Sequence, residues 1–150
     1  MSLCVFGINS LINGLFQCIF NDKQSLIPTF VSMARDTLLK QRWERLVTKL
    51  SAQFSEGDPL DLEGIIYLVG VQELGQLHRN FKKDEKVNLM HIAICKLLEP
   101  YGYYEFDFFD EEGWPHYTVK ENLPPLRSGE QSVLMKDALV NYFLEKEYII

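Results

Sequence analysis

The chain has 150 residues and a formal net charge of −6. We expect no nucleic-acid binding, because contacts to phosphate groups need clustered Lys and Arg side chains. The length suits one domain with one core. We therefore expect a single domain made of an apolar N-terminal segment, residues 1–21, and a main body, residues 29–147.

The cysteines indicate a reducing compartment. There are three of them, Cys4, Cys18 and Cys95, which is an odd number without a closely spaced pair. A disulfide framework is not expected from this pattern. We interpret the three residues as reduced thiols, mostly buried, in a cytoplasmic protein.

The segment Met1–Asn21 carries no charged side chain and is largely apolar. It lacks the basic start and the small-residue cleavage site of a signal peptide, and Asn9, Asn13 and Gln17 dilute it for a membrane-spanning helix. A buried helix is our first interpretation. A protein-partner or self-association surface within Met1–Phe20 is the second, and membrane contact, which we do not expect, is the third.

A helical period runs from Thr29 to Phe54, after a polar connection that ends at Pro28. The apolar stripe that we expect to face the core consists of Phe30, Met33, Ala34, Leu38, Trp43, Leu46, Val47, Leu50 and Phe54. The basic residues lie mostly off this stripe, and they are Arg35, Lys40, Arg42, Arg45 and Lys49. They form the only local basic face of the chain, which we interpret as a solvated helix face.

A second helix is predicted after the break at residues 55–59, with Asp58 as its N-cap and Pro59 in its first turn. Apolar residues then appear on nearly every helical face, so we expect this helix to be central and buried. A strand over Ile65–Val71 is the alternative. The glycines of this helix indicate close approach of a neighbouring helix, and they are Gly64, Gly70 and Gly75.

A third clear helix begins at Asp84 and Glu85 and ends before Pro100 and Gly102. A strand period follows. It places Tyr104, Phe106 and Phe108 on one face and Tyr103, Glu105 and Asp107 on the other. The stretch from Asp110 to Gly113 predicts a turn, and Trp114–Val119 is the return strand, which Pro115 confines to an edge.

The last predicted helix follows a linker over residues 122–129. Ser128 is its candidate N-cap, and Gln131 stands three residues later, where the partner in a capping box belongs. The fold class we predict is mainly α, with about five helices around one core and one β-hairpin.

One helix brings together side chains that could bind a metal. His91 and Cys95 share a helix face, Glu99 continues the row, and Glu73, His78 or His116 could complete a site. No second spaced pair supports this hypothesis, so we interpret His91 and Cys95 as packed residues. Motifs for a phosphate loop, a calcium loop and a serine nucleophile are absent. We therefore predict no catalytic residue, metal or cofactor.

The hairpin is the best candidate for a contact surface, because it combines aromatic rings with dense carboxylates. The candidate interaction or ligand residues are Tyr103, Tyr104, Glu105, Asp107, Trp114, His116 and His91. Our first functional hypothesis is a non-catalytic protein-interaction or accessory module. The alternative is a small enzyme or ligand-binding protein that uses His91, His116 and a hairpin carboxylate. Plain packing of the rings and a solvated acidic edge are the simpler interpretations of the same residues.

The order of two helices and a hairpin is also similar to a winged helix, with Asp84–Glu99 as the recognition helix. The helix opens with acidic residues and the hairpin tip reads DEEG, so phosphate repulsion disfavours DNA contact. A winged-helix-like arrangement used for protein contact stays open.

Four stretches of the chain carry a resemblance to a known family. They read VGVQELG (Val69–Gly75), KKDEK (Lys82–Lys86), LMHIAICKLLEPYGYYEF (Leu89–Phe106) and DEEGWPHY (Asp110–Tyr117), and LPPL and GEQSVLMKDAL farther on are similar too. The C-terminal two thirds of the chain, roughly, thus resembles an uncharacterised family of small bacterial proteins. The resemblance implies no activity, cofactor or catalytic residue, and it does not extend to the apolar N-terminal run.

Overall fold

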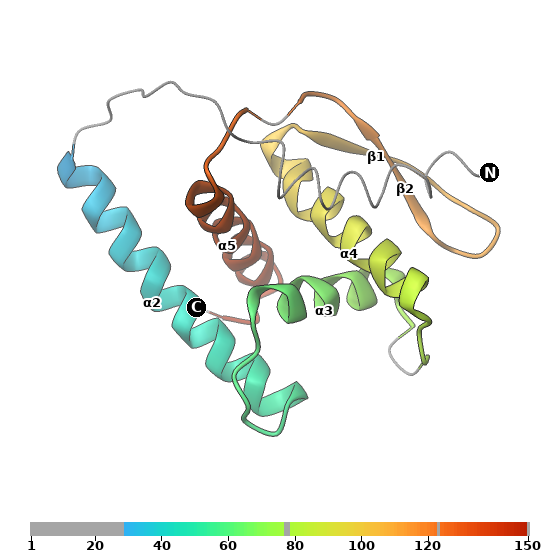
Figure 1. Cartoon of the computed structure of the whole chain (residues 1–150), viewed down its shortest axis with the longest axis horizontal. Coiled ribbons are helices and arrows are strands. Elements are labelled where there is room, and N and C mark those ends of the chain that lie inside the picture. The colour runs from blue at the N-terminus through green and yellow to red at the C-terminus, as the bar shows by residue number, and fades with distance from the viewer. Residues whose placement is uncertain (1–28, 77–78, 123, 150) are drawn as a thin grey trace.

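The computed structural model describes residues 29–76, 79–122 and 124–149 (Figure 1). These residues form α2 (Thr29–Phe54), α3 (Leu62–Leu74), α4 (Lys83–Leu98), the 3-10 helix η1 (Glu99–Tyr101), β1 (Tyr104–Phe109), β2 (Pro115–Val119) and α5 (Ser128–Glu145). The predicted mainly α fold with one hairpin is confirmed. The described residues hold four α-helices, one fewer than the five expected, and the expected helix within Met1–Asn21 lies outside them.

α3 is central, as its all-round apolar sequence predicts, and Ile65–Val71 is helical rather than a strand. It approaches α4 closely at Gly70, where an added Cβ would lie 2.2 Å from the carbonyl oxygen of Leu89. Only glycine fits there, so the predicted role in helix packing is confirmed at Gly70. Gly75 has a different role, because its φ of 73° ends α3 as a left-handed C-cap.

The N-cap of α3 is Asp61, not Asp58 as predicted. The Oδ1 atom of Asp61 accepts a hydrogen bond from the backbone N–H of Gly64 at 2.7 Å, which satisfies one of the free donors of the first turn. Both positions carry Asp, so composition alone did not distinguish them. No helix in the described parts of the chain is both long and apolar enough to cross a membrane.

α5 also begins differently from the prediction. Ser128 is the first helical residue instead of the cap. The backbone N–H of Arg127 donates to the Oε2 atom of Glu130 at 2.8 Å, so Glu130 has the role that we assigned to Gln131. A carboxylate near a helix N-terminus is favoured by the helix dipole, which is the physical reason for this arrangement.

The core lies where α3, α4, α5 and the C-terminal half of α2 meet. Its completely buried large side chains are Leu46, Leu50, Ile65, Val69, Leu89, Cys95, Leu97, Leu98, Leu139 and Val140. Burying one such aliphatic side chain is worth roughly 1.5–3 kcal/mol. Apolar packing between these helices therefore holds the fold together.

Only part of α2 is covered. Leu38 and Phe54 were expected in the core stripe, but their side chains are 46% and 50% exposed. In Figure 1 the N-terminal end of α2 stands apart from the other helices. Leu38 lies on a side of α2 that the core does not cover, whereas its neighbour Leu39 packs against the core. Phe54 is the last residue of the helix and lies beyond the packed region.

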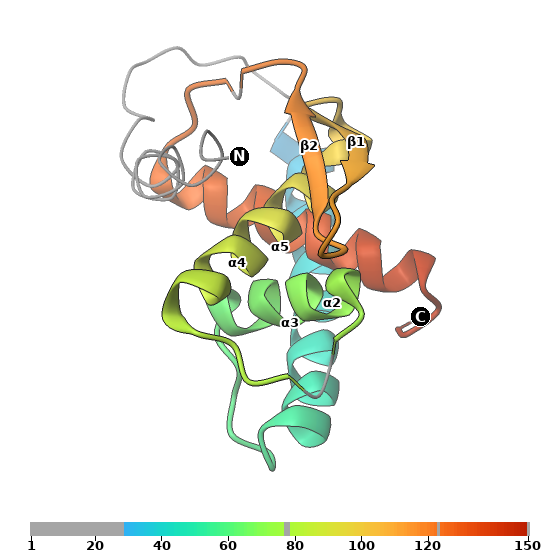
Figure 2. The ribbon, with the colours of Figure 1, turned by 90° about the vertical axis from the view of Figure 1, so that its right-hand side faces the viewer.

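The hairpin packs along α4, on the side of the molecule away from α2. Both strands contact α4. α2 and the hairpin lie on opposite sides in Figure 1, and Figure 2, seen along that direction, shows the hairpin in front and α2 behind. The hairpin and α2 therefore present two separate surfaces.

Candidate functional site

A β-bulge at Asp107 decides which hairpin side chains share a face. Phe106 is paired with Tyr117 and Phe108 with His116, so Asp107 is the extra residue between two consecutive pairs. Because neighbouring residues of β2 point to opposite faces, Phe108 lies on the face opposite to Phe106. The predicted alternation, which put Tyr104, Phe106 and Phe108 on one face, is wrong at Phe108.

The ring contacts agree with this register. On one face, the ring centroid of Phe106 lies 4.9 Å from that of Phe109 and 5.8 Å from that of Tyr117. On the other face, the rings of Phe108 and His116 stack with their centroids 4.7 Å apart. The hairpin therefore presents aromatic rings on both of its faces.

The rings most exposed to solvent are phenylalanines. Phe106, Phe108 and Phe109 are 38%, 50% and 61% exposed, and Val119 at the other end of the hairpin is also exposed. Seven large apolar side chains are exposed in the described part of the chain, and four of them belong to this hairpin. Sequence reasoning missed Phe109 and assigned Phe106 and Phe108 to one face. The run Phe106-Asp107-Phe108-Phe109 was the available signal, because strict alternation cannot bury all three rings.

Several residues of the predicted surface are packed instead. Tyr104 is only 8% exposed and belongs to the main core, and Tyr103 is half-buried against that core. Trp114 is half-buried and packs against the cluster of Val71, Leu74 and Leu89, which α3 and α4 supply. An exposed platform of Tyr103, Tyr104 and Trp114 is therefore not found. These rings attach the hairpin to the helices.

Asp110 organises the turn. Its Oδ1 atom accepts hydrogen bonds from the backbone N–H groups of Trp114 at 2.8 Å and Glu112 at 3.0 Å. Its Oδ2 atom lies 2.9 Å from Nε2 of His116. The hydrogen bond with His116, followed by that from Trp114, lowers the pKa of Asp110 below its usual value. This network holds the turn and the His116–Phe108 stack in one arrangement.

The remaining hairpin carboxylates form an acidic rim along the strand and turn that carry or adjoin the exposed rings. Glu105 pairs with Lys120 across the strands. Asp107, Glu111 and Glu112 are exposed, and none of them forms an ion pair with any residue in the described ranges. The rim therefore carries uncompensated negative charge beside apolar rings.

His91 and Cys95 meet on α4, as their spacing predicts. The Nε2 atom of His91 lies 3.6 Å from the Sγ atom of Cys95, and Cys95 is completely buried. Burial lowers the pKa of His91, and its Nδ1 atom is buried without a hydrogen-bond partner. A thiol closed off from solvent in an apolar core is poorly suited to nucleophilic chemistry.

The other ligands considered for a metal site are used elsewhere. The Tyr142 hydroxyl donates a hydrogen bond to Oε1 of Glu73 at 2.5 Å, and the pKa of Tyr142 is raised by burial and by this bond. Glu99 forms an ion pair with Lys96 at 3.1 Å and accepts a hydrogen bond from the backbone N–H of Phe106. His78 lies outside the described residues. Within those residues, no group of three or more His, Cys, Asp or Glu could hold a metal ion.

His91 and His116 have different partners. His91 contacts Cys95, whereas His116 contacts Asp110 and Phe108. No hydrogen bond or ion pair within residues 29–76, 79–122 and 124–149 joins the two histidines or links His91 to a hairpin carboxylate. Among the described residues, the structure thus joins His116 to the hairpin carboxylate Asp110 but does not bring His91 to either of them.

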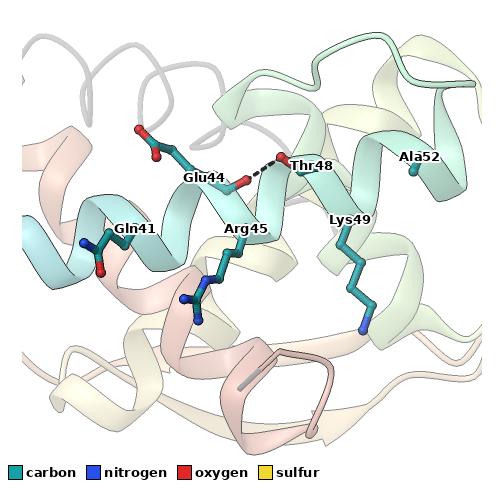
Figure 3. Close-up of a pocket in the computed structure, with 6 residues that line it drawn as sticks. All are labelled: Gln41, Glu44, Arg45, Thr48, Lys49 and Ala52. Carbon is teal, nitrogen blue, oxygen red and sulfur yellow. Dashed lines mark hydrogen bonds between the residues drawn. The ribbon is translucent and has the colours of Figure 1, made fainter.

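Two surface depressions lie away from the predicted residues. One, of about 430 Å³, lies between the end of α4 and α5, where the Tyr101 hydroxyl donates to Oδ2 of Asp137 at 2.6 Å. The other, of about 490 Å³, runs along the solvent side of α2 beside Arg45 and Lys49 (Figure 3). Neither is lined by His91, His116 or a hairpin carboxylate.

Comparisons with protein-family models, curated proteins and solved structures found no match to this chain. The resemblance to a bacterial family therefore stays a prediction. Function has to be inferred from the geometry of the described residues.

Proposed function

We propose that this protein is a non-catalytic interaction module whose hairpin binds a protein partner through Phe106, Phe108 and Phe109. The observation that carries the proposal is the concentration of exposed apolar side chains on the hairpin. Single exposed apolar residues are ordinary, but adjoining exposed rings mark binding surfaces in soluble proteins. Aromatic residues are also enriched in protein–protein interfaces.

The acidic rim indicates what kind of partner fits. Asp107 lies between the rings of β1 in sequence, Glu111 and Glu112 lie in the adjoining turn, and all three are exposed. A partner that offers an apolar surface flanked by Lys or Arg would match both features. Such charge complementarity mainly increases the rate and the specificity of association.

The anchoring of the hairpin favours binding. Trp114 and Tyr104 fix it to the helices, and Asp110 orders its turn through three hydrogen bonds. An ordered surface loses less conformational entropy on binding than a flexible loop does. The packed rings therefore position the exposed ones.

The alternative of a small enzyme or ligand-binding protein draws less support, because His116 contacts the hairpin carboxylate Asp110 but His91 forms no hydrogen bond or ion pair with either of them among the described residues. Each histidine is explained by its immediate surroundings, one in the core of α4 and one in the hairpin turn. A cytoplasmic location belongs to the proposal and rests on the cysteine pattern alone.

Affinity capture with matched variants tests the proposal. Phe108→Ser combined with Phe109→Ser should abolish capture of the partner that the wild-type chain recovers from its source cells. Phe54→Ser removes an equally exposed ring from the end of α2 and should leave capture unchanged. Quantitative mass spectrometry of the three captures compares them directly.

Folding has to be unchanged for this comparison. Substitutions of exposed side chains usually alter stability by about 0.5 kcal/mol or less, so the thermal unfolding of all three proteins should nearly coincide. The proposal fails if the folded double variant recovers the same proteins as the wild-type chain, in the same amounts.

A further inference from the structure

α2 carries a continuous basic stripe. Its members are spaced alternately three and four residues apart, which places them on one side of the helix. They are Arg35, Leu38, Arg42, Arg45 and Lys49. Figure 3 shows Arg45 and Lys49 extending from the same side of α2. The stripe includes no acidic residue, and its one apolar member, Leu38, is exposed.

The arginines of the stripe are not neutralised by the residues that the structure describes. Arg35, Arg42 and Arg45 form no ion pair with any residue that the structure describes. Like charges at this spacing repel one another and destabilise an isolated helix. Lys40 differs, because it lies four residues from both Asp36 and Glu44 on another face. Lys49, by contrast, donates to the carbonyl oxygen of Tyr148 and lies over its ring, so the uncompensated charge of the stripe is that of the three arginines.

This stripe matches the partner that the hairpin surface requires. The hairpin offers apolar rings with an acidic rim, and the stripe offers an exposed Leu38 among cations. The two surfaces cannot meet within one molecule, since α2 and the hairpin lie on opposite sides of it (Figures 1 and 2). They can meet only between two molecules.

We infer that the chain self-associates head to tail, with the hairpin of one copy bound to the basic stripe on α2 of a second copy. The inference rests on the proposed function of the hairpin and specifies its partner. A contact between two different surfaces on opposite sides does not close in a dimer, so it generates rings or open chains.

Sedimentation of the intact protein at increasing concentration tests the inference first. We expect the average mass to rise with concentration beyond that of a dimer. Raising the salt from about 0.01 M to about 1 M shortens the screening length from about 30 Å to about 3 Å, so it should shift the protein towards the monomer.

Two loss variants make the test specific. The stripe variant carries Arg42→Gln and Arg45→Gln, and the hairpin variant carries Phe108→Ser and Phe109→Ser. Each alone should be monomeric, because it lacks one of the two surfaces. Their mixture should form a 1:1 complex and nothing larger, since only one productive contact remains. Lys40→Gln, which removes a charge off the stripe, should self-associate like the wild-type chain.

Three results would overturn the inference: a wild-type monomer at all concentrations in low salt, self-association that survives the stripe substitutions, or a mixture that stays monomeric. Binding of duplex DNA or anionic vesicles by a monomeric wild-type chain, lost in the stripe variant, would assign the stripe to a polyanion instead. The proposed function fails separately, because its test is whether capture of a partner depends on Phe108 and Phe109.

Discussion

Asp110 shows how a single carboxylate can shape the surface around it. It joins the turn backbone to His116, and His116 in turn stacks on the exposed Phe108. The turn and its Gly113, which has a φ of 84°, follow the sequence prediction. The hydrogen bonds of Asp110 could not be predicted, because five carboxylates lie close together in the hairpin and the sequence does not show which of them bonds to the turn.

The pH dependence of the turn follows from this network. The folded pKa of Asp110 is lower than its unfolded value of about 3.9, so its contribution to stability is present above that pH and lost as the pH falls through the folded value. In NMR titrations, the amide resonances of Glu112 and Trp114 should move with a midpoint below about 3.9. Asp110→Asn should abolish this transition, and a midpoint at or above the usual value would contradict the network.

The bulge at Asp107 could not be predicted from sequence. Alternation of apolar and polar residues assumes an unbroken strand, whereas the pairing here is irregular between Phe106 and Phe108. Tyr104 and Trp114, on either side of the bulge, both pack against the helices. A shift of one residue moves every later side chain to the other face. This is why Phe108 lies on the face opposite to Phe106, although alternation placed both rings on the same face.

At the scale of elements, the helices were predictable because the spacing of their apolar residues and the capping or breaking residues at their ends indicate the same segments. All four described helices match predicted segments, and the errors are confined to caps and to covered faces. Leu38 lies eight residues before Leu46, which is not a whole number of helical turns, so the two side chains point in different directions. Leu38 lies on the side of α2 that carries the basic stripe, whereas Leu39 faces the core, and the approximate period did not separate the two positions.

The contact of α3 with α4 gives a test at this scale. Gly70→Ala would force a methyl group against the Leu89 carbonyl, and it should destabilise the fold by about 1–3 kcal/mol through overpacking. Gly129→Ala in the first turn of α5 meets no atom within 4 Å, so it should leave stability unchanged or raise it by up to about 1 kcal/mol. Chemical denaturation of both variants measures this, and equal effects would argue against the close approach.

At the scale of the whole molecule, the net charge conceals the distribution that matters. A total of −6 excluded nucleic acid in the sequence analysis, yet α2 carries five basic and two acidic residues and the hairpin is acidic. The separation of these surfaces became visible only once the fold placed them on opposite sides (Figure 1). Composition therefore gave only the total charge, and the fold indicated where contacts could be made.

The central claim is that the exposed rings of the hairpin are a binding surface. The most direct measurement replaces Phe108 with a photo-crosslinking amino acid in living cells and compares it with the same replacement of Phe54. We predict a discrete crosslinked species from position 108 and none from position 54, with twice the mass of the chain if the partner is a second copy. No product at position 108, or equal products at both positions, would contradict the claim.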